Sequence, residues 1–222
     1  MAKNETLRRI ADSGLIPVVR APSEDDALRV VDALREGGVE IIELTMTVPG
    51  ALRIIEQLAR RYGDSVVLGA GTVLDSETAR ACIMSGATFV VSPMVDESII
   101  RCCRTYGVAV LPGALTPTEV VRAWRSGADM VKVFPCGAMG GALYLKSLKA
   151  PLPQIDLVPT GGVSLATVAD LIGAGASAVG AGADLVDVAR ARGGDSGVSQ
   201  NARKYLSAIK AARASTAAPR AS

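Results

Sequence analysis

Two charged residues interrupt strand-like apolar runs and could activate a carbonyl group. Lys132 stands in the run MVKVFP at 130–135, and Glu43 stands in the run VEIIELT at 39–45. Side chains alternate along a strand, so each residue faces away from its Val or Ile neighbours, into the interior if the strands form a barrel. An amine kept from water attacks a ketone more readily, and a nearby carboxylate moves the protons. The pair indicates Schiff-base chemistry, and its structural alternative is a buried ion pair.

Glycine-rich segments follow the last two predicted strands. In barrels, the loops after strands 7 and 8 often hold phosphate, because glycines let backbone N–H groups approach the anion closely. The segments PTGGV at 159–163 and GAGA at 180–183 therefore predict a phosphate subsite. Two further residues stand at the ends of predicted strands. Arg20 could hold a carboxylate by paired hydrogen bonds, and Thr72 offers a hydroxyl group.

The composition argues against several kinds of function. Histidine is absent, so the chain has no histidine base, no Ser-His-Asp triad and no histidine-based metal site, and we expect no metal. The net charge is +2 and aromatic residues make up 3% of the chain, which argues against nucleic-acid binding. No apolar run reaches the length of about 18–20 residues that spans a bilayer. The polar start and cysteines without CxxC spacing favour a soluble, cytoplasmic protein.

Strand-like and helical segments alternate along the chain, and they must position the residues named above. Runs rich in Val, Ile and Leu are typical of strands covered on both faces, and eight are predicted, at 15–20, 39–45, 66–71, 88–92, 108–112, 130–135, 155–160 and 177–182. Helical patterns lie between them, so we predict an α/β fold, a single-domain (β/α)8 TIM barrel over residues 1–213. The alternative is an open doubly wound sheet, whose first turn would be glycine-rich, unlike RAPS at 20–23.

The two ends of the chain are predicted to lie outside this repeat. A short helix over residues 4–13 is expected to plug the floor of the barrel, with Gly14 ending it. A closing helix is expected over residues 199–213. Residues 214–222 are mostly small and polar, which predicts a disordered tail.

Five short segments form a recognisable series. They are, in order along the chain, ELT at 43–45, GAGTV at 69–73, SP at 92–93, VKVFP at 131–135 and PTGGV at 159–163. The series resembles the class I aldolases of the 2-keto-3-deoxy-6-phosphogluconate (KDPG) and 4-hydroxy-2-oxoglutarate (KHG) aldolase family, over residues 15–186. The resemblance implies reversible cleavage of KDPG to pyruvate and glyceraldehyde 3-phosphate, or of KHG to pyruvate and glyoxylate. It also implies a homotrimer that binds the keto acid and pyruvate without cofactor or metal.

The resemblance further implies a role for each candidate residue. Lys132 would form the imine, and Glu43 would act as the general acid and base. Thr72 and Thr160 would help to hold the pyruvyl carboxylate and hydroxyl groups, and Pro93 would shape the pocket. Backbone groups of three glycines would hold the distal phosphate: Gly161, Gly162 and Gly182.

Two departures from the family pattern bear on the substrate. Many members carry an arginine four residues after the catalytic glutamate, where this chain has Thr47, so we assign the carboxylate to Arg20 instead. Ala183 stands where members often place a serine hydroxyl on the phosphate. Losing one such hydrogen bond costs about 1–2 kcal/mol, which weakens a preference for phosphate without abolishing it. We expect a phosphorylated substrate, with an unphosphorylated keto acid as the alternative.

Two other functions fit part of the pattern. A phosphosugar isomerase or epimerase would use the same glycine loops without forming an imine. A non-catalytic sugar-phosphate-binding barrel would keep Lys132 and Glu43 as a structural ion pair. The aldolase accounts for a buried lysine, an inward carboxylate and phosphate loops together, so we favour it.

Overall fold

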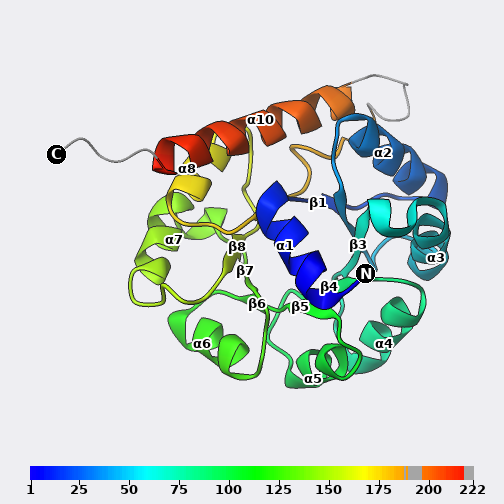
Figure 1. The fold of residues 1–222 in the computed structure, drawn as a ribbon, viewed down its shortest axis with the longest axis horizontal. Coiled ribbons are helices and arrows are strands. Elements are labelled where there is room, and N and C mark those ends of the chain that lie inside the picture. Colours follow the sequence, from blue (N-terminus) through cyan, green and yellow to red (C-terminus); the bar gives the residue numbers. More distant parts are fainter. Residues whose placement is uncertain (188, 190–196, 218–222) are drawn as a thin grey trace.

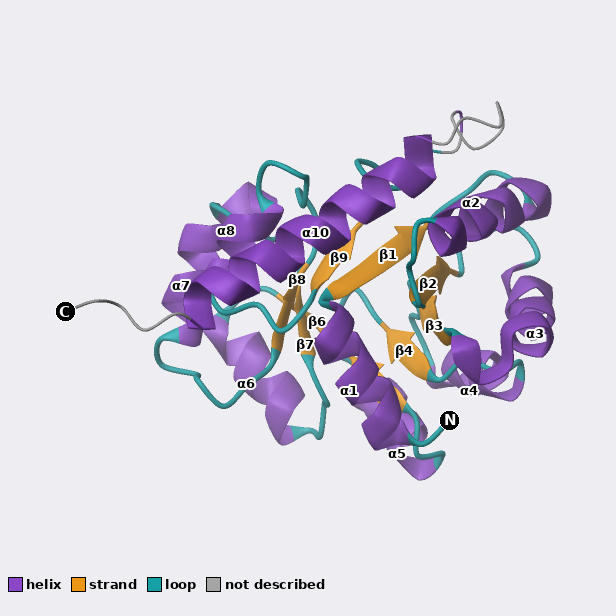
Figure 2. Cartoon of the chain, turned by 45° about the horizontal axis from the view of Figure 1, so that its top comes forward, coloured by secondary structure: helices purple, strands orange, loops and turns teal. Residues whose placement is uncertain are grey.

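A computed structural model describes residues 1–187, 189 and 197–217, and its strands form a ring surrounded by helices (Figures 1 and 2). The strands are β1 (Leu15–Val19), β2 (Ile41–Thr45), β3 (Val67–Gly71), β4 (Phe89–Val91), β5 (Ala109–Leu111), β6 (Gly113–Ala114), β7 (Val131–Val133), β8 (Leu157–Pro159) and β9 (Val179–Ala181). Each of the eight predicted runs contains or overlaps one of these strands. The fifth run was predicted to end at Pro112; β5 ends one residue before it, and the two-residue strand β6 follows it, beyond the predicted run.

The ring closes in the order of the sequence. Strands β5-β4-β3-β2-β1-β9 are hydrogen-bonded neighbours in one sheet, and β6-β7-β8 form another. Every strand pair in the described residues is parallel. One residue separates β5 from β6, and a bridge between Thr160 and Gly180 joins the β8 side to the β9 side. The predicted TIM barrel is therefore confirmed.

Alternation along the strands separates two apolar clusters. The inner cluster fills the ring and includes Ile41 of β2 and Met130, which precedes β7. The outer cluster lies between strands and helices and includes Leu44 of β2 and Val133 of β7. This period of two leaves residues 43 and 132 on the inner side. Both interruptions of the apolar runs thus point into the barrel.

Helix α1 (Lys3–Ser13) closes one end of the ring and crosses its centre in Figure 1. Ile10 is fully buried and belongs to the inner cluster. The helix ends at Gly14, whose φ of 70° lies in the left-handed region and whose N–H donates to the Ile10 carbonyl. Because β1 starts at the next residue, α1 covers the N-terminal ends of the strands. The predicted floor plug is present and begins one residue earlier than expected.

The outer helices follow the strands, and several begin at a side-chain cap. They are α2 (Glu24–Glu36), α3 (Ala51–Tyr62), α4 (Ser76–Met84), α5 (Glu97–Thr105), α6 (Pro117–Arg125), α7 (Ala142–Lys149) and α8 (Val168–Gly173), with 3-10 turns η1 (Gly63–Ser65) and η2 (Gly137–Met139). Ser23, Asp75 and Asp96 each accept a backbone N–H in the first turn of their helix, and Thr116 forms a capping box with Glu119. These caps fix where the helices start and keep the loops after the strands short.

Helix α10 (Gly197–Ala217) packs across α2 and α8 on the outside of the ring. Ala202 and Ile209 of this helix are buried and belong to the outer cluster. The helix extends four residues beyond its expected end, so the prediction of a disordered tail is wrong for residues 214–217, and residues 218–222 lie outside the described residues. Within the described ranges, no helix combines the length and apolarity needed to cross a membrane.

Candidate active site

A cavity of about 610 Å³ opens at the C-terminal ends of the strands, opposite α1. Its walls include all ten residues that the sequence singled out: Arg20, Glu43, Thr72, Pro93, Lys132, Thr160, Gly161, Gly162, Gly182 and Ala183. Each lies within a strand or in the loop that directly follows one. This is the face at which βα loops build active sites in barrels. The structure thus brings the predicted site residues together, while their individual roles stay predictions.

Lys132 reaches the cavity from the middle of β7. Its neighbours Val131 and Val133 are fully buried in the outer cluster, and the lysine itself is 7% exposed. The Nζ atom lies 5.1 Å from the centre of the Phe134 ring, a distance at which a cation is attracted to the ring face. Its amine forms no ion pair within 4.0 Å with any described residue. The amine therefore faces the cavity without a carboxylate in direct contact.

Glu43 reaches the same cavity from β2 and is 2% exposed. Its Oε1 atom has no hydrogen-bond partner among the described residues. Burial raises the pKa of the Glu43 carboxyl group, and the charges of Lys132 and Arg20 lower it by less. A carboxyl group with a raised pKa holds and releases a proton closer to neutral pH, which is what a general acid and base requires.

The end of β3 is shaped around Glu43. A Cβ atom added at Gly71 would lie 1.9 Å from Glu43 Oε1 and 2.6 Å from its Cδ, so only glycine leaves room for this carboxyl group. The next residue, Thr72, has a φ of 58°, in the left-handed region that costs a non-glycine residue about 1–3 kcal/mol. Thr72 is thus a residue with a strained backbone in the wall of the cavity, and it carries a hydroxyl group.

The loops after β8 and β9 form the end of the cavity that we call the distal end. Gly161 and Gly162 have φ values of 83° and 78°, which side chains rarely adopt. A Cβ at Gly162 would lie 2.9 Å from Gly137 Cα, whereas a Cβ at Gly182 would meet no atom within 4 Å. Space beside the backbone is therefore open at Gly182, whereas the same side of Gly162 packs against Gly137. The described residues hold no group of three or more His, Cys, Asp or Glu side chains placed to bind a metal ion.

Sequence reasoning missed five residues of the cavity wall. They are Val18, Phe134, Val163, Ser164 and Asp184. The alternation that selected Lys132 also placed Phe134 on the inner face, so this residue could have been found. Asp184 stands two residues after Gly182, and its polar side chain in a predicted ligand loop was a second usable signal.

Comparison with known proteins gives one consistent result. The chain matches the family model described as KDPG and KHG aldolase over residues 7–198. It is 36% identical over 200 residues to the 2-dehydro-3-deoxy-6-phosphogalactonate aldolase of Escherichia coli, covering 90% of this chain and 94% of that protein. It is also 36% identical over 171 residues to the 2-dehydro-3-deoxy-phosphogluconate aldolase of Pseudomonas aeruginosa, covering 77% and 76% of the two chains.

A solved structure adds a chemical point of comparison. The KDPG aldolase of Legionella pneumophila, with pyruvate captured as a covalent carbinolamine intermediate, superimposes with a TM-score of 0.77. The two sequences are 26% identical, and the match covers 93% of this chain and 97% of that one. The fold and the chemistry of that relative both agree with a barrel built around a reactive amine.

Proposed function

Because this chain belongs to the KDPG and KHG aldolase family of class I, metal-independent lyases, we propose that it cleaves a 2-keto-4-hydroxy acid to pyruvate and an aldehyde through an imine at Lys132. One observation carries the assignment of residues: Lys132 and Glu43 are both buried and face one cavity, yet no ion pair within 4.0 Å joins them. A purely structural pair would be expected to make direct contact, because burial of two separated charges is costly.

The first half of the proposed reaction forms the imine. The neutral amine of Lys132 attacks the C2 ketone of the substrate to give a carbinolamine. Glu43 donates a proton to the departing C2 hydroxyl, which leaves as water, and the iminium ion remains on Lys132. The raised pKa of Glu43 suits this donation, since the carboxyl group must carry the proton when the carbinolamine forms.

The second half breaks the carbon–carbon bond. Glu43, now a carboxylate, accepts the proton of the C4 hydroxyl directly or through water as the C3–C4 bond breaks and the aldehyde leaves. The iminium ion takes up the electron pair and becomes an enamine. Protonation at C3 and addition of water then release pyruvate and restore the amine. The water lost on imine formation is returned at hydrolysis, so the sequence is balanced.

The remaining wall residues would hold the two ends of the substrate. Arg20, Thr72 and Thr160 would bind the carboxylate and hydroxyl groups of the pyruvyl half, and Pro93 would shape the pocket beside them. The loops with Gly161, Gly162, Gly182 and Ala183 would receive the far end of the aldehyde half. KDPG and KHG are the expected substrates, and the name of the Escherichia coli relative adds the phosphogalactonate epimer.

Steady-state release of pyruvate from these three acids tests the proposal. Glu43→Gln is expected to lower kcat by about 100-fold or more, because general acid–base catalysis contributes factors of about 10²–10⁴. If this variant changed stability but left turnover intact, the pair would be structural, as in a sugar-phosphate-binding barrel. Turnover by Lys132→Ala would favour an isomerase-like or other mechanism without an imine.

The homotrimer implied by the resemblance is also part of the proposal. Several large apolar side chains are exposed on the isolated chain, among them Met84 and Leu143, which are 68% and 75% exposed. Such side chains are common at interfaces between subunits. Light scattering of the purified protein should give three times the 22.8 kDa mass of one chain. A single-chain mass that persists at micromolar concentration would contradict it.

A further inference from the structure

Strands β8 and β9, which precede the two glycine loops at the distal end of the cavity, are joined by few backbone contacts. In the described part of the chain β8 pairs with β7 and β9 pairs with β1, but β8 and β9 form no ladder with each other. A bridge between Thr160 and Gly180 joins the two sides, as does a hydrogen bond from the Ser177 N–H to the Leu157 carbonyl. The relative position of the two glycine loops therefore depends on further contacts.

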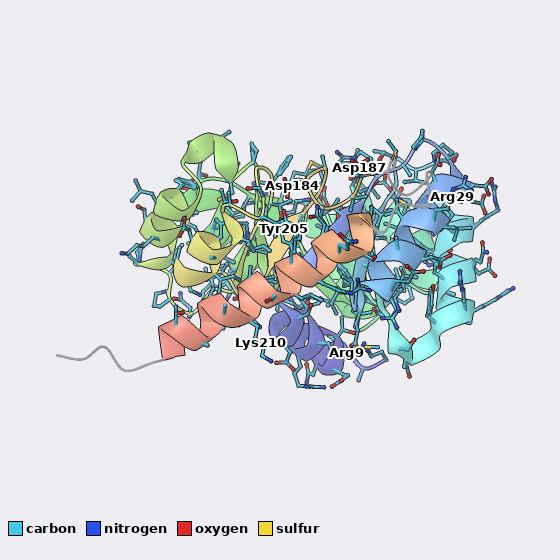
Figure 3. All side chains as sticks on the ribbon, turned by 90° about the horizontal axis from the view of Figure 1, so that it is seen from above. Arg9, Arg29, Asp184, Asp187, Tyr205 and Lys210 are labelled. Atoms are coloured by element: carbon cyan, nitrogen blue, oxygen red, sulfur yellow. The ribbon has the colours of Figure 1, made fainter. Side chains whose placement is uncertain are left out.

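A side chain of α10 connects these two loops. Tyr205 is fully buried, and its hydroxyl group donates to Asp184 Oδ2 at 2.5 Å. The same carboxylate oxygen accepts the backbone N–H of Leu165, in the loop after β8, at 3.3 Å. The side-chain amide of Asn201 donates to the Asp184 carbonyl at 3.0 Å. Figure 3 labels Tyr205 on α10 and Asp184 on the neighbouring loop. One carboxylate thus links the loop after β8, the loop after β9 and the outer helix.

The surroundings of the Tyr205 hydroxyl group favour this link. Burial and the hydrogen bond to Asp184 raise the pKa of Tyr205, so the hydroxyl group keeps its proton and acts as the donor. A buried hydroxyl group needs a partner, and a charged acceptor gives the stronger hydrogen bond. Asp184 stands two residues after Gly182 in one loop. In the other loop, the Val163 carbonyl directly follows Gly162 and lies 3.5 Å from the same hydroxyl group. Tyr205 therefore contacts the backbone or side chain beside both glycine loops.

We propose that Tyr205 is a positioning residue for the distal end of the substrate: through Asp184 it holds the two glycine loops at the separation that a phosphate group needs. The inference rests on the proposed aldolase function, in which these loops receive the far end of the aldehyde half. A phosphate accepts hydrogen bonds on several oxygens, so N–H groups of both loops would converge on it. A shift of one loop breaks part of that set, whereas Lys132 on β7 and Glu43 on β2 keep their places. Loss of the Tyr205 hydroxyl group therefore weakens binding of the phosphate end and spares the chemical step.

Separate measurement of KM and kcat for KDPG and for KHG tests the proposal. KHG has a shorter carbon chain than KDPG and carries no phosphate, so its binding does not depend on the distal loops. Tyr205→Phe keeps the buried ring and removes the donor to Asp184. It should raise the KM for KDPG by about tenfold, the effect of losing one hydrogen bond to a charged group. The kcat for KDPG and the KM for KHG should stay within about twofold of the wild-type values, because the reacting groups are not displaced.

Two comparisons distinguish positioning from a general loss of stability. Tyr62→Phe is the matched control, because the Tyr62 hydroxyl group donates to Asp32 at 2.8 Å, between α3 and α2, and neither residue belongs to the cavity wall. Both KM values should stay within about twofold in this variant, since only a remote hydrogen bond is lost. In an Asp184→Ala background, which lacks the acceptor, Tyr205→Phe should change the KM for KDPG by less than about twofold, because the two residues act as one link.

Calorimetric titration with inorganic phosphate tests the same link without turnover, and Tyr205→Phe should weaken phosphate binding by a similar factor. An unchanged KM for KDPG, an equal rise in both KM values, or an additive effect in the Asp184→Ala background would overturn the role of Tyr205. A wild-type protein that neither cleaves KDPG nor binds phosphate would overturn it as well. Failure of the wild-type protein to release pyruvate from either acid would instead overturn the proposed aldolase function, and the phosphate titration would then decide the role of Tyr205 by itself.

Discussion

Gly71→Ala is a small change that should displace the proposed general acid and base without unfolding the barrel. The added Cβ would lie 1.9 Å from Glu43 Oε1, whereas real Cβ contacts are essentially never shorter than 3.0 Å. Oε1 must therefore move by more than 1 Å. The Glu43 carboxyl group can move because it stands at the end of a flexible side chain. The φ of Gly71 is not in the left-handed region, so the backbone at this position accepts alanine.

The expected effect follows from that displacement. Misplacing a catalytic group by about 1 Å costs about 100-fold in rate, so kcat should fall by about that factor. Overpacking at a buried site costs about 1–3 kcal/mol of unfolding free energy, which a barrel of this size tolerates. The loss should be smaller in a Glu43→Asp background, because a shorter side chain leaves space for the new methyl group.

Pyruvate release under saturating substrate measures the effect, with circular dichroism as the check on folding. Gly173→Ala is the matched control, because a Cβ at this position in α8 would meet no atom within 4 Å. It should retain wild-type kcat. A folded Gly71→Ala protein with kcat within about threefold of wild type would refute the role given to the Glu43 position.

Three further outcomes are expected. Burial raises the pKa of Glu43 above its ordinary value of 4.5, so the folded chain binds this proton more tightly than the unfolded chain does. The stability that this contributes is fully present below pH 4.5 and is lost as the pH rises through the folded pKa. The Tm of Glu43→Gln relative to wild type should therefore increase as the pH rises above 4.5, which differential scanning fluorimetry measures. Tyr205→Phe removes the donor to Asp184 and should lower the free energy of unfolding by about 1–2 kcal/mol in urea titrations. Thr72→Gly relieves a left-handed conformation and should raise that free energy by about 1 kcal/mol while kcat/KM falls; a loss of stability would contradict the strain.

The two central side chains could be predicted because a closed barrel imposes a simple rule on sequence. Its strands are covered on both faces, so an inward charge interrupts a continuous apolar run, as Lys132 and Glu43 do. The position of the glycine loops could be predicted too. They follow the last two strands, so they must lie at the C-terminal end of the barrel. The pattern therefore predicted which two charged side chains face the cavity, and at which end of the barrel they lie.

Contacts between distant segments could not be predicted in the same way. The fit of Glu43 over Gly71 depends on the register of β2 against β3, which strand composition does not encode. The fixed position of Asp184 depends on Tyr205, 21 residues later on a helix that returns across the ring. The end of β5 before Pro112 has a local cause instead: proline has no N–H group to donate to the hydrogen bonds between strands.

Borohydride reduction in the presence of pyruvate tests the imine at Lys132 most directly. Peptide mass mapping should find one reduced pyruvyl group, attached to Lys132, and Lys132→Ala should acquire none. Modification of another lysine, or a fully active enzyme that pyruvate and borohydride leave unmodified, would contradict the account.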